Sequence, residues 1–132
     1  MIDWILAALA LFVVQTLIPA SIRYLLAGPG IAARLRIALG PRDDEPPLSA
    51  IGARAARALA NMQEALPVFL TLALLHVVRA EGDSLSVSGA AVFVAARTAY
   101  VPAYLVGWVG VRSTIWVVSW LGLGAMIAAL VA

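Results

Sequence analysis

Apolar residues fill four long stretches of the chain, and shorter polar stretches separate them. The apolar stretches predict four helices, over about residues 2–27, 50–79, 85–108 and 114–132. Each stretch is close to, or longer than, the roughly 20 apolar residues that a helix needs to cross a bilayer. The pattern therefore predicts an all-α integral membrane protein, a bundle of four transmembrane helices in a single domain over residues 1–132.

The longest polar stretch lies between the first and second predicted helices, over about residues 28–50, and is rich in proline, glycine and charge. Such a stretch is expected to lie outside the hydrocarbon. Within it, the segment 31–39 is mostly apolar but carries Arg34 and Arg36. We expect a short helix here that lies at the membrane surface, with both arginines directed toward lipid headgroups.

Composition also indicates a membrane rather than water as the solvent. Hydrophobic residues make up 64% of the chain and charged residues 12%, whereas a soluble domain has about 45–50% and about 25%. Cysteine is absent and histidine occurs once, as His76. This excludes a catalytic thiol of the protein itself and a zinc site built from several histidines, so no metal site is predicted.

All nine basic residues are arginines, and six of them lie in the first connection or at its flanks. The first connection holds Arg34, Arg36 and Arg42, and the third holds Arg112, whereas the second has only Arg79 beside two acids. Because positively charged connections remain in the cytoplasm, we predict that both termini lie on the non-cytoplasmic side. The arginines flank apolar stretches, so membrane lipid and not nucleic acid is the predicted partner.

Polar side chains within the second and third predicted helices fall on one face of each helix. In the second helix they lie at positions i, i+4 and i+7: Arg57, Asn61 and Glu64. In the third helix they lie at i, i+3 and i+7: Arg97, Tyr100 and Tyr104. Residues with these spacings share one face of an α-helix. Charges inside a membrane span are costly, so we expect both faces to point into the bundle or into a watery cavity.

The two polar faces are predicted to meet at the same depth in the membrane. At a rise of about 1.5 Å per residue, Glu64 lies roughly 15 Å inward from Arg54. Tyr104 and Tyr100 lie roughly 12 and 18 Å inward from Arg112. A cavity open to the cytoplasm follows, suited to a small and mostly anionic ligand. The alternative is that Glu64 pairs with an arginine of either helix and only holds the bundle together.

Three motifs along the chain carry a resemblance to a known family. The most specific lies in the second helix: Arg57-Ala-x-x-Asn61-x-x-Glu64-x-x-Pro67-x-Phe69-Leu70. The third helix and its end contain Ala96-Arg97-x-x-Tyr100-x-x-x-Tyr104, followed by Arg112-Ser113. The first connection contains Gly40-Pro41-Arg42-Asp43, followed by Leu48-Ser49. Over about residues 5–130, the chain resembles bacterial members of the MAPEG family, membrane-associated proteins in eicosanoid and glutathione metabolism.

The resemblance implies a four-helix bundle that assembles as a homotrimer in the bacterial inner membrane. In enzymes of the family, glutathione binds as co-substrate between subunits near the cytoplasmic side, and a small lipophilic substrate reaches it from the lipid. By their position in the motifs, the glutathione-binding residues would be Arg57, Asn61, Glu64, Arg97, Tyr100 and Tyr104. The resemblance also implies two catalytic residues. Arg112 matches an arginine proposed to stabilise the glutathione thiolate, and Ser113 matches a serine implicated in some prostaglandin-forming members.

The leading hypothesis for function is a membrane-bound glutathione-dependent transferase or peroxidase that acts on lipophilic electrophiles. An arginine beside the sulfur would increase the fraction of reactive thiolate at neutral pH. The alternative is a non-catalytic, MAPEG-like scaffold that binds lipid or thiol, because the family also includes a non-enzymatic ligand-binding member. Leu59 stands where enzymes of the family often carry a polar side chain, and Ala65 stands where one branch has a tyrosine. A proton-coupled transporter that uses Glu64 is disfavoured by the arginines around that carboxylate.

Overall fold

A computed structural model describes residues 1–25, 30–41, 47–79 and 83–132, and every element in these ranges is a helix. In chain order the helices are α1 (Ile2–Leu25), α2 (Ile31–Leu39), α3 (Ala50–Arg79), α4 (Ser84–Val106) and α5 (Val109–Val131). Four of them, α1, α3, α4 and α5, are long and apolar enough to cross a membrane. These four helices agree with the predicted all-α membrane bundle, and α2 confirms the short helix expected between the first two spans.

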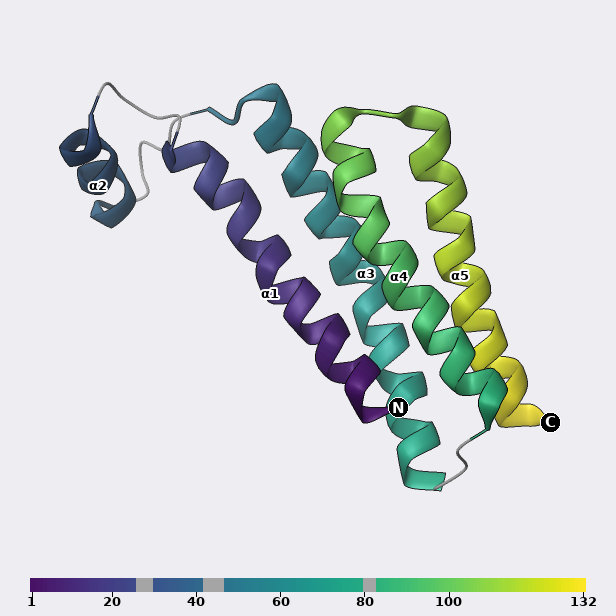
Figure 1. Ribbon diagram of the computed structural model, residues 1–132. Coiled ribbons are helices and arrows are strands. Elements are labelled where there is room, and N and C mark those ends of the chain that lie inside the picture. Colours follow the sequence, from purple (N-terminus) through teal and green to yellow (C-terminus); the bar gives the residue numbers. More distant parts are fainter. Residues whose placement is uncertain (26–29, 42–46, 80–82) are drawn as a thin grey trace.

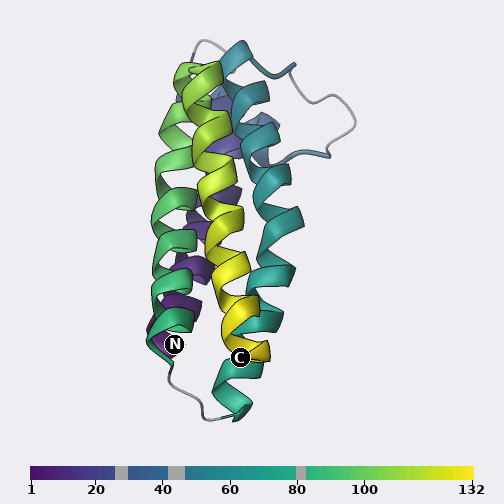
Figure 2. The ribbon, with the colours of Figure 1, turned by 90° about the vertical axis from the view of Figure 1, so that its right-hand side faces the viewer.

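The four long helices run side by side, and α2 stands apart at one end of the bundle, beside the end of α1 (Figure 1). The most extensive contact joins α4 and α5, followed by the contact between α1 and α3. Both chain ends lie at the opposite end of the bundle from α2 (Figures 1 and 2). The two termini lie at the same end because the chain crosses the bundle four times, once in each long helix.

Aromatic and aliphatic side chains fill the apolar core of the bundle. Phe69 of α3 and Phe93 of α4 stack with their ring centroids 4.6 Å apart and their planes 7° from parallel. Both are fully buried, as are Met62 of α3 and Met126 of α5. The core continues toward the end that carries the termini, through buried residues late in α3 and α5.

Gly89 of α4 and Gly122 of α5 bring two helix backbones into direct contact. A Cβ atom at Gly89 would lie 2.6 Å from the Gly122 carbonyl oxygen, and a Cβ atom at Gly122 would lie 2.7 Å from the Gly89 carbonyl oxygen. Both distances are shorter than real Cβ contacts, so only glycine fits at either position without a shift of the backbone. Small residues at helix interfaces are a common means of close packing in membranes.

The turn between α4 and α5 differs from the prediction. Helix α5 begins at Val109, whereas the apolar pattern places its start near Thr114. Gly107 has a φ of +90°, and its N–H donates a 3.1 Å hydrogen bond to the Ala103 carbonyl oxygen at the end of α4. Because a left-handed glycine ends one helix and turns the chain at once, only Gly107 and Trp108 separate the two helices. Arg112 therefore lies in the first turns of α5 and not in a loop.

The remaining helix boundaries lie close to those expected. Helix α3 covers Ala50–Arg79, and α4 begins at Ser84. The Asp83 carboxylate caps α4 by accepting the Leu85 N–H at 3.0 Å. The expected end of the first helix at residue 27 lies outside the described residues, as does Arg42 of the first connection.

Candidate ligand-binding site

Arg97 lies near the middle of α4, where that helix contacts α3. Its side chain is only 1% exposed. Nη1 donates a hydrogen bond to Oδ1 of Asn61 on α3. Nε and Nη2 are also buried and have no hydrogen-bond partner within the described part of the chain. Because unpaired buried donors are costly, this guanidinium is suited to a further acceptor, such as a carboxylate.

Aromatic rings extend from Arg97 toward the α4–α5 turn. The Arg97 Cζ atom lies 5.4 Å from the Phe93 ring centroid and 5.7 Å from that of Tyr100. The Tyr100 and Tyr104 ring centroids are 5.3 Å apart. The Arg112 Cζ atom lies 4.8 Å from the Tyr104 ring centroid. These ring contacts and the hydrogen bond between Arg97 and Asn61 join five polar residues, which we call the polar row: Asn61, Arg97, Tyr100, Tyr104 and Arg112.

Arg57 and Glu64 lie on the exposed surface of α3, outside the polar row. Glu64 follows Asn61 by three positions in α3, so the two residues are neighbours on the surface of that helix. The hydrogen bond of Arg97, however, goes to Asn61. Two charged side chains on a membrane-spanning helix are expected to face a partner or water rather than lipid. A single chain thus leaves part of the predicted site on its outer surface.

Arg54 of α3 is a residue of this region whose contacts the sequence does not predict. Its Nη1 donates to the carbonyl oxygen of Leu105 at 3.1 Å and to that of Val106 at 3.3 Å. These carbonyls end α4, where the helix dipole favours a cation. A Cβ atom at Gly107 would come within 3.1 Å of the Arg54 guanidinium. Arg54 therefore stabilises the turn that precedes Arg112. The sequence contains one indication of this contact, an arginine that can reach the end of a neighbouring helix.

Two other residues singled out in the sequence make contacts inside the fold. Ser113 is exposed, and its hydroxyl donates to the Val109 carbonyl oxygen of its own helix at 3.0 Å. His76 is buried near the opposite end of α3, and its Nε2 forms a 2.9 Å hydrogen bond with the Met126 carbonyl oxygen. Ser113 follows Arg112 in the chain, but its hydroxyl is bonded within α5 and not to Tyr104. His76 joins α3 to α5.

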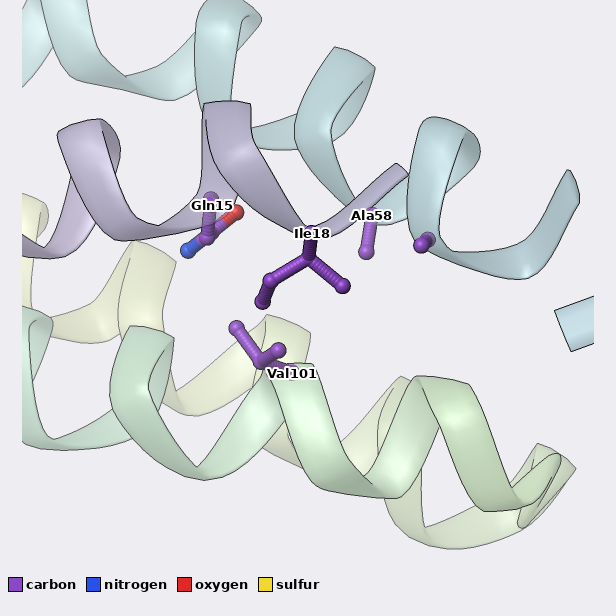
Figure 3. Close-up of a pocket in the computed structure, with 5 residues that line it drawn as sticks. Gln15, Ile18, Ala58 and Val101 are labelled. Atoms are coloured by element: carbon purple, nitrogen blue, oxygen red, sulfur yellow. The ribbon is translucent and has the colours of Figure 1, made fainter. Parts of the chain in front are cut away.

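A narrow crevice lies between α1, α3 and α4. Its lining residues are Gln15, Ile18, Ala55, Ala58 and Val101. Figure 3 shows Ile18 and Val101 facing each other across it. The crevice is too narrow to hold a water molecule, so it is a seam in the packing and not a ligand pocket. Within the described ranges, no three His, Cys, Asp or Glu residues cluster as a metal site would require.

Comparison with known proteins identifies the family of the chain. No curated protein and no solved structure matches it. The sequence model of the MAPEG family matches residues 2–132. This match extends beyond the motifs to nearly the whole length and includes all four apolar helices. The chain therefore belongs to the MAPEG family and is a membrane protein of that glutathione- and eicosanoid-metabolising group.

Proposed function

We propose that this protein is a glutathione-dependent transferase or peroxidase that acts on lipophilic electrophiles. The observation that carries the proposal is the Arg97 guanidinium, which is buried and bonded to Asn61 and has two further nitrogens without a partner among the described residues. Glutathione is an anionic peptide with two carboxylates, and charge-assisted hydrogen bonds to a carboxylate are among the strongest in proteins. Family membership supports the same ligand class.

Arg112 is proposed to act on the sulfur of the bound thiol. It lies at the end of the polar row, against Tyr104, in the first turns of α5. A guanidinium beside a thiol stabilises the thiolate, which is the nucleophile. In the transferase reaction the thiolate sulfur attacks an electrophilic carbon, a C–S bond forms, and the displaced group leaves with its electron pair. Ser113, next in the chain, is the second candidate for a catalytic role.

The lipophilic substrate is proposed to approach through a groove on the outer side of α4 and α5. The groove has a volume of about 270 Å³ and is almost wholly apolar. Its lining includes Thr114 and Ile115, which follow Arg112 closely in α5, and three alanines of α4. A hydrophobic molecule dissolved in the bilayer can therefore reach the region of Arg112 without crossing water.

The complete site is proposed to form between subunits of a homotrimer. Arg57 and Glu64 are exposed on one chain although they lie within a membrane-spanning helix. A partner chain packed on this face of α3 would remove both charges from lipid and bring them to the same ligand as the polar row. The arginine distribution supports a site that opens to the cytoplasm, and the resemblance to bacterial members of the family supports a bacterial inner membrane.

The proposal is tested by glutathione binding and by conjugation of a lipophilic electrophile. Arg97→Gln should weaken glutathione binding roughly 10- to 150-fold, the effect of about 1.5–3 kcal/mol for one charge-assisted hydrogen bond. Calorimetry on the detergent-solubilised protein measures this affinity. The matched control is Arg79→Gln, because Arg79 donates to the Leu130 carbonyl oxygen at the other end of the bundle and its loss should leave thiol affinity unchanged.

The outcomes separate the two candidate functions. Binding and conjugation by the wild type, with binding weakened only in Arg97→Gln, support the enzyme. Binding without any conjugation supports the non-catalytic thiol-binding scaffold. If the wild type binds no thiol, the polar row is a structural seam of the bundle and the proposal is wrong. Asn61→Ala, which removes the partner of Arg97 rather than the buried cation, provides a second variant if Arg97→Gln fails to fold.

A further inference from the structure

Helix α2 and the end of α1 form a second surface, separate from the polar row. A groove of about 220 Å³ lies there. Its lining residues are Tyr24 of α1 and Ile31, Arg34, Leu35 and Ala38 of α2. The four α2 residues lie at positions i, i+3, i+4 and i+7, so they share one face of the helix. The groove is therefore a feature of how α2 lies beside α1, and its walls are almost wholly apolar.

Arg34 brings a cation to this apolar groove. Its Nε atom is buried and has no hydrogen-bond partner among the residues that the structure describes. Two other arginines, Arg54 and Arg79, donate to carbonyl oxygens at helix ends, so the chain elsewhere uses arginines to complete its own backbone hydrogen bonding. A buried donor without a partner is costly. Its position in the groove points to an external acceptor.

Helix α2 also exposes an apolar stripe. Ile31, Leu35 and Leu39 follow one another at intervals of four residues and are 76%, 53% and 83% exposed. A helix that combines such a stripe with arginines is typical of one that lies in the membrane interface. The end of α1, a membrane-spanning helix, lies beside it (Figure 1). Tyr24 in the groove is itself of the residue type that favours the interface.

We propose that this groove binds one anionic phospholipid, with the phosphate at Arg34 and part of an acyl chain against Ile31 and Leu35. The groove is smaller than the roughly 300–1,000 Å³ of pockets that enclose a whole soluble ligand, but a segment of acyl chain needs only an apolar channel. Arg34 in the groove favours a lipid of net negative charge over a zwitterionic one. The site uses different residues from the thiol site and does not depend on it.

The test measures which lipids the purified full-length protein retains. The protein is equilibrated with micelles that contain equal amounts of phosphatidylglycerol and phosphatidylcholine, and bound lipids are counted by native mass spectrometry. The wild type should retain phosphatidylglycerol preferentially. Arg34→Gln should lower that retention about tenfold, the lower end of the effect of losing a charge-assisted hydrogen bond.

Two matched controls separate a built site from general surface charge. Arg36→Gln removes the same charge from an exposed position on the same helix and should change retention by about twofold at most. Leu35→Asn alters the groove, whereas Leu39→Asn alters an exposed leucine that does not line it. Only the first of these two should reduce retention. Circular dichroism verifies that all four variants keep their helices.

Three results would overturn the proposal. Equal losses in Arg34→Gln and Arg36→Gln would mean that lipid is attracted by net charge alone. Unchanged retention in both Arg34→Gln and Leu35→Asn would mean that the groove binds no lipid. Displacement of the lipid by millimolar inorganic phosphate would mean that Arg34 takes a free anion and that the apolar groove contributes nothing.

Discussion

Arg112 is held by an aromatic ring. Its Cζ atom lies 4.8 Å from the Tyr104 ring centroid, within the range of a cation–π contact. A neutral ring fixes the position of a guanidinium without cancelling its charge, so the positive field stays available to an anionic ligand. Arg97, beside the rings of Phe93 and Tyr100, shares this property. The two cations can therefore serve different parts of one ligand, a carboxylate and a thiolate.

Arg112→Ala is expected to slow thiol conjugation far more than it weakens thiol binding. Loss of one electrostatic stabiliser of developing charge costs about 100-fold or more in kcat. Without the cation, the bound thiol keeps its proton to a higher pH, so the curve of rate against pH should move toward higher pH. Arg112→Lys keeps the charge and is the control. A slower rate with an unmoved pH profile would assign Arg112 a structural role instead.

Gly107→Ala is expected to destabilise the protein by about 1–3 kcal/mol, because an alanine at positive φ is strained. The added Cβ would also meet the Arg54 guanidinium at 3.1 Å and disturb its hydrogen bonds to the end of α4. Gly110→Ala is the matched control, since a Cβ there meets nothing within 4 Å. Thermal unfolding in detergent compares the two. Equal Tm values would contradict the strain argument.

At the scale of the helices, the contact between α4 and α5 depends on Gly89 and Gly122. Gly122→Ala should cost about 1–3 kcal/mol by overpacking, because the new methyl group would meet backbone atoms of Gly89 and Phe93, which cannot rotate away. Gly124→Ala, two residues further along α5 and open to space, should leave stability unchanged or raised. Unfolding in a denaturing detergent measures both variants. If Gly122→Ala proved as stable as Gly124→Ala, the close backbone contact would not exist.

The sequence predicts the number of long helices and their polar faces because these depend on local patterns, the length of apolar runs and the helical period. It misplaces the start of α5, because Arg112 interrupts the apolar pattern and the left-handed backbone of Gly107 does not follow from periodicity. The partner of Arg54 is 51 positions away, so it depends on how α3 packs against α4. Periodicity likewise shows which residues share a polar face, but not how the helix is rotated relative to its neighbours. The sequence therefore does not distinguish the exposed Glu64 from the half-buried Asn61.

At the scale of the whole molecule, both chain ends lie together at one end of the bundle (Figure 1), and the arginines predict the side that they face. Reporter fusions after Leu39 should read cytoplasmic, and fusions after Asp83 should read external, because the arginine-rich connections stay inside. The opposite readings would defeat the charge argument. They would leave the fold unchanged but place the polar row at the external end.

The exposed charges of α3 predict an assembly of several chains. In detergent solution, light scattering corrected for bound detergent should give the mass of three copies. Saturating glutathione should then protect Arg57 and Glu64 from water-soluble carboxyl- and arginine-modifying reagents, unlike the exposed Arg36 of α2. A stable monomer that still bound thiol would rule out a site shared between subunits.

The two-residue turn between α4 and α5 bears on how the chain enters the membrane during synthesis. Helix α4 carries Arg97 near its middle, and inserting an arginine at the centre of a span costs about 2.5–3.5 kcal/mol. Helix α5 carries no charge after Arg112 in its first turns, so its insertion is favourable. Because so short a turn keeps the pair in register and Gly89 meets Gly122, α4 and α5 are expected to leave the translocon as one helical hairpin. A nascent chain that stopped at Gly107 would then hold α4 in the bilayer poorly.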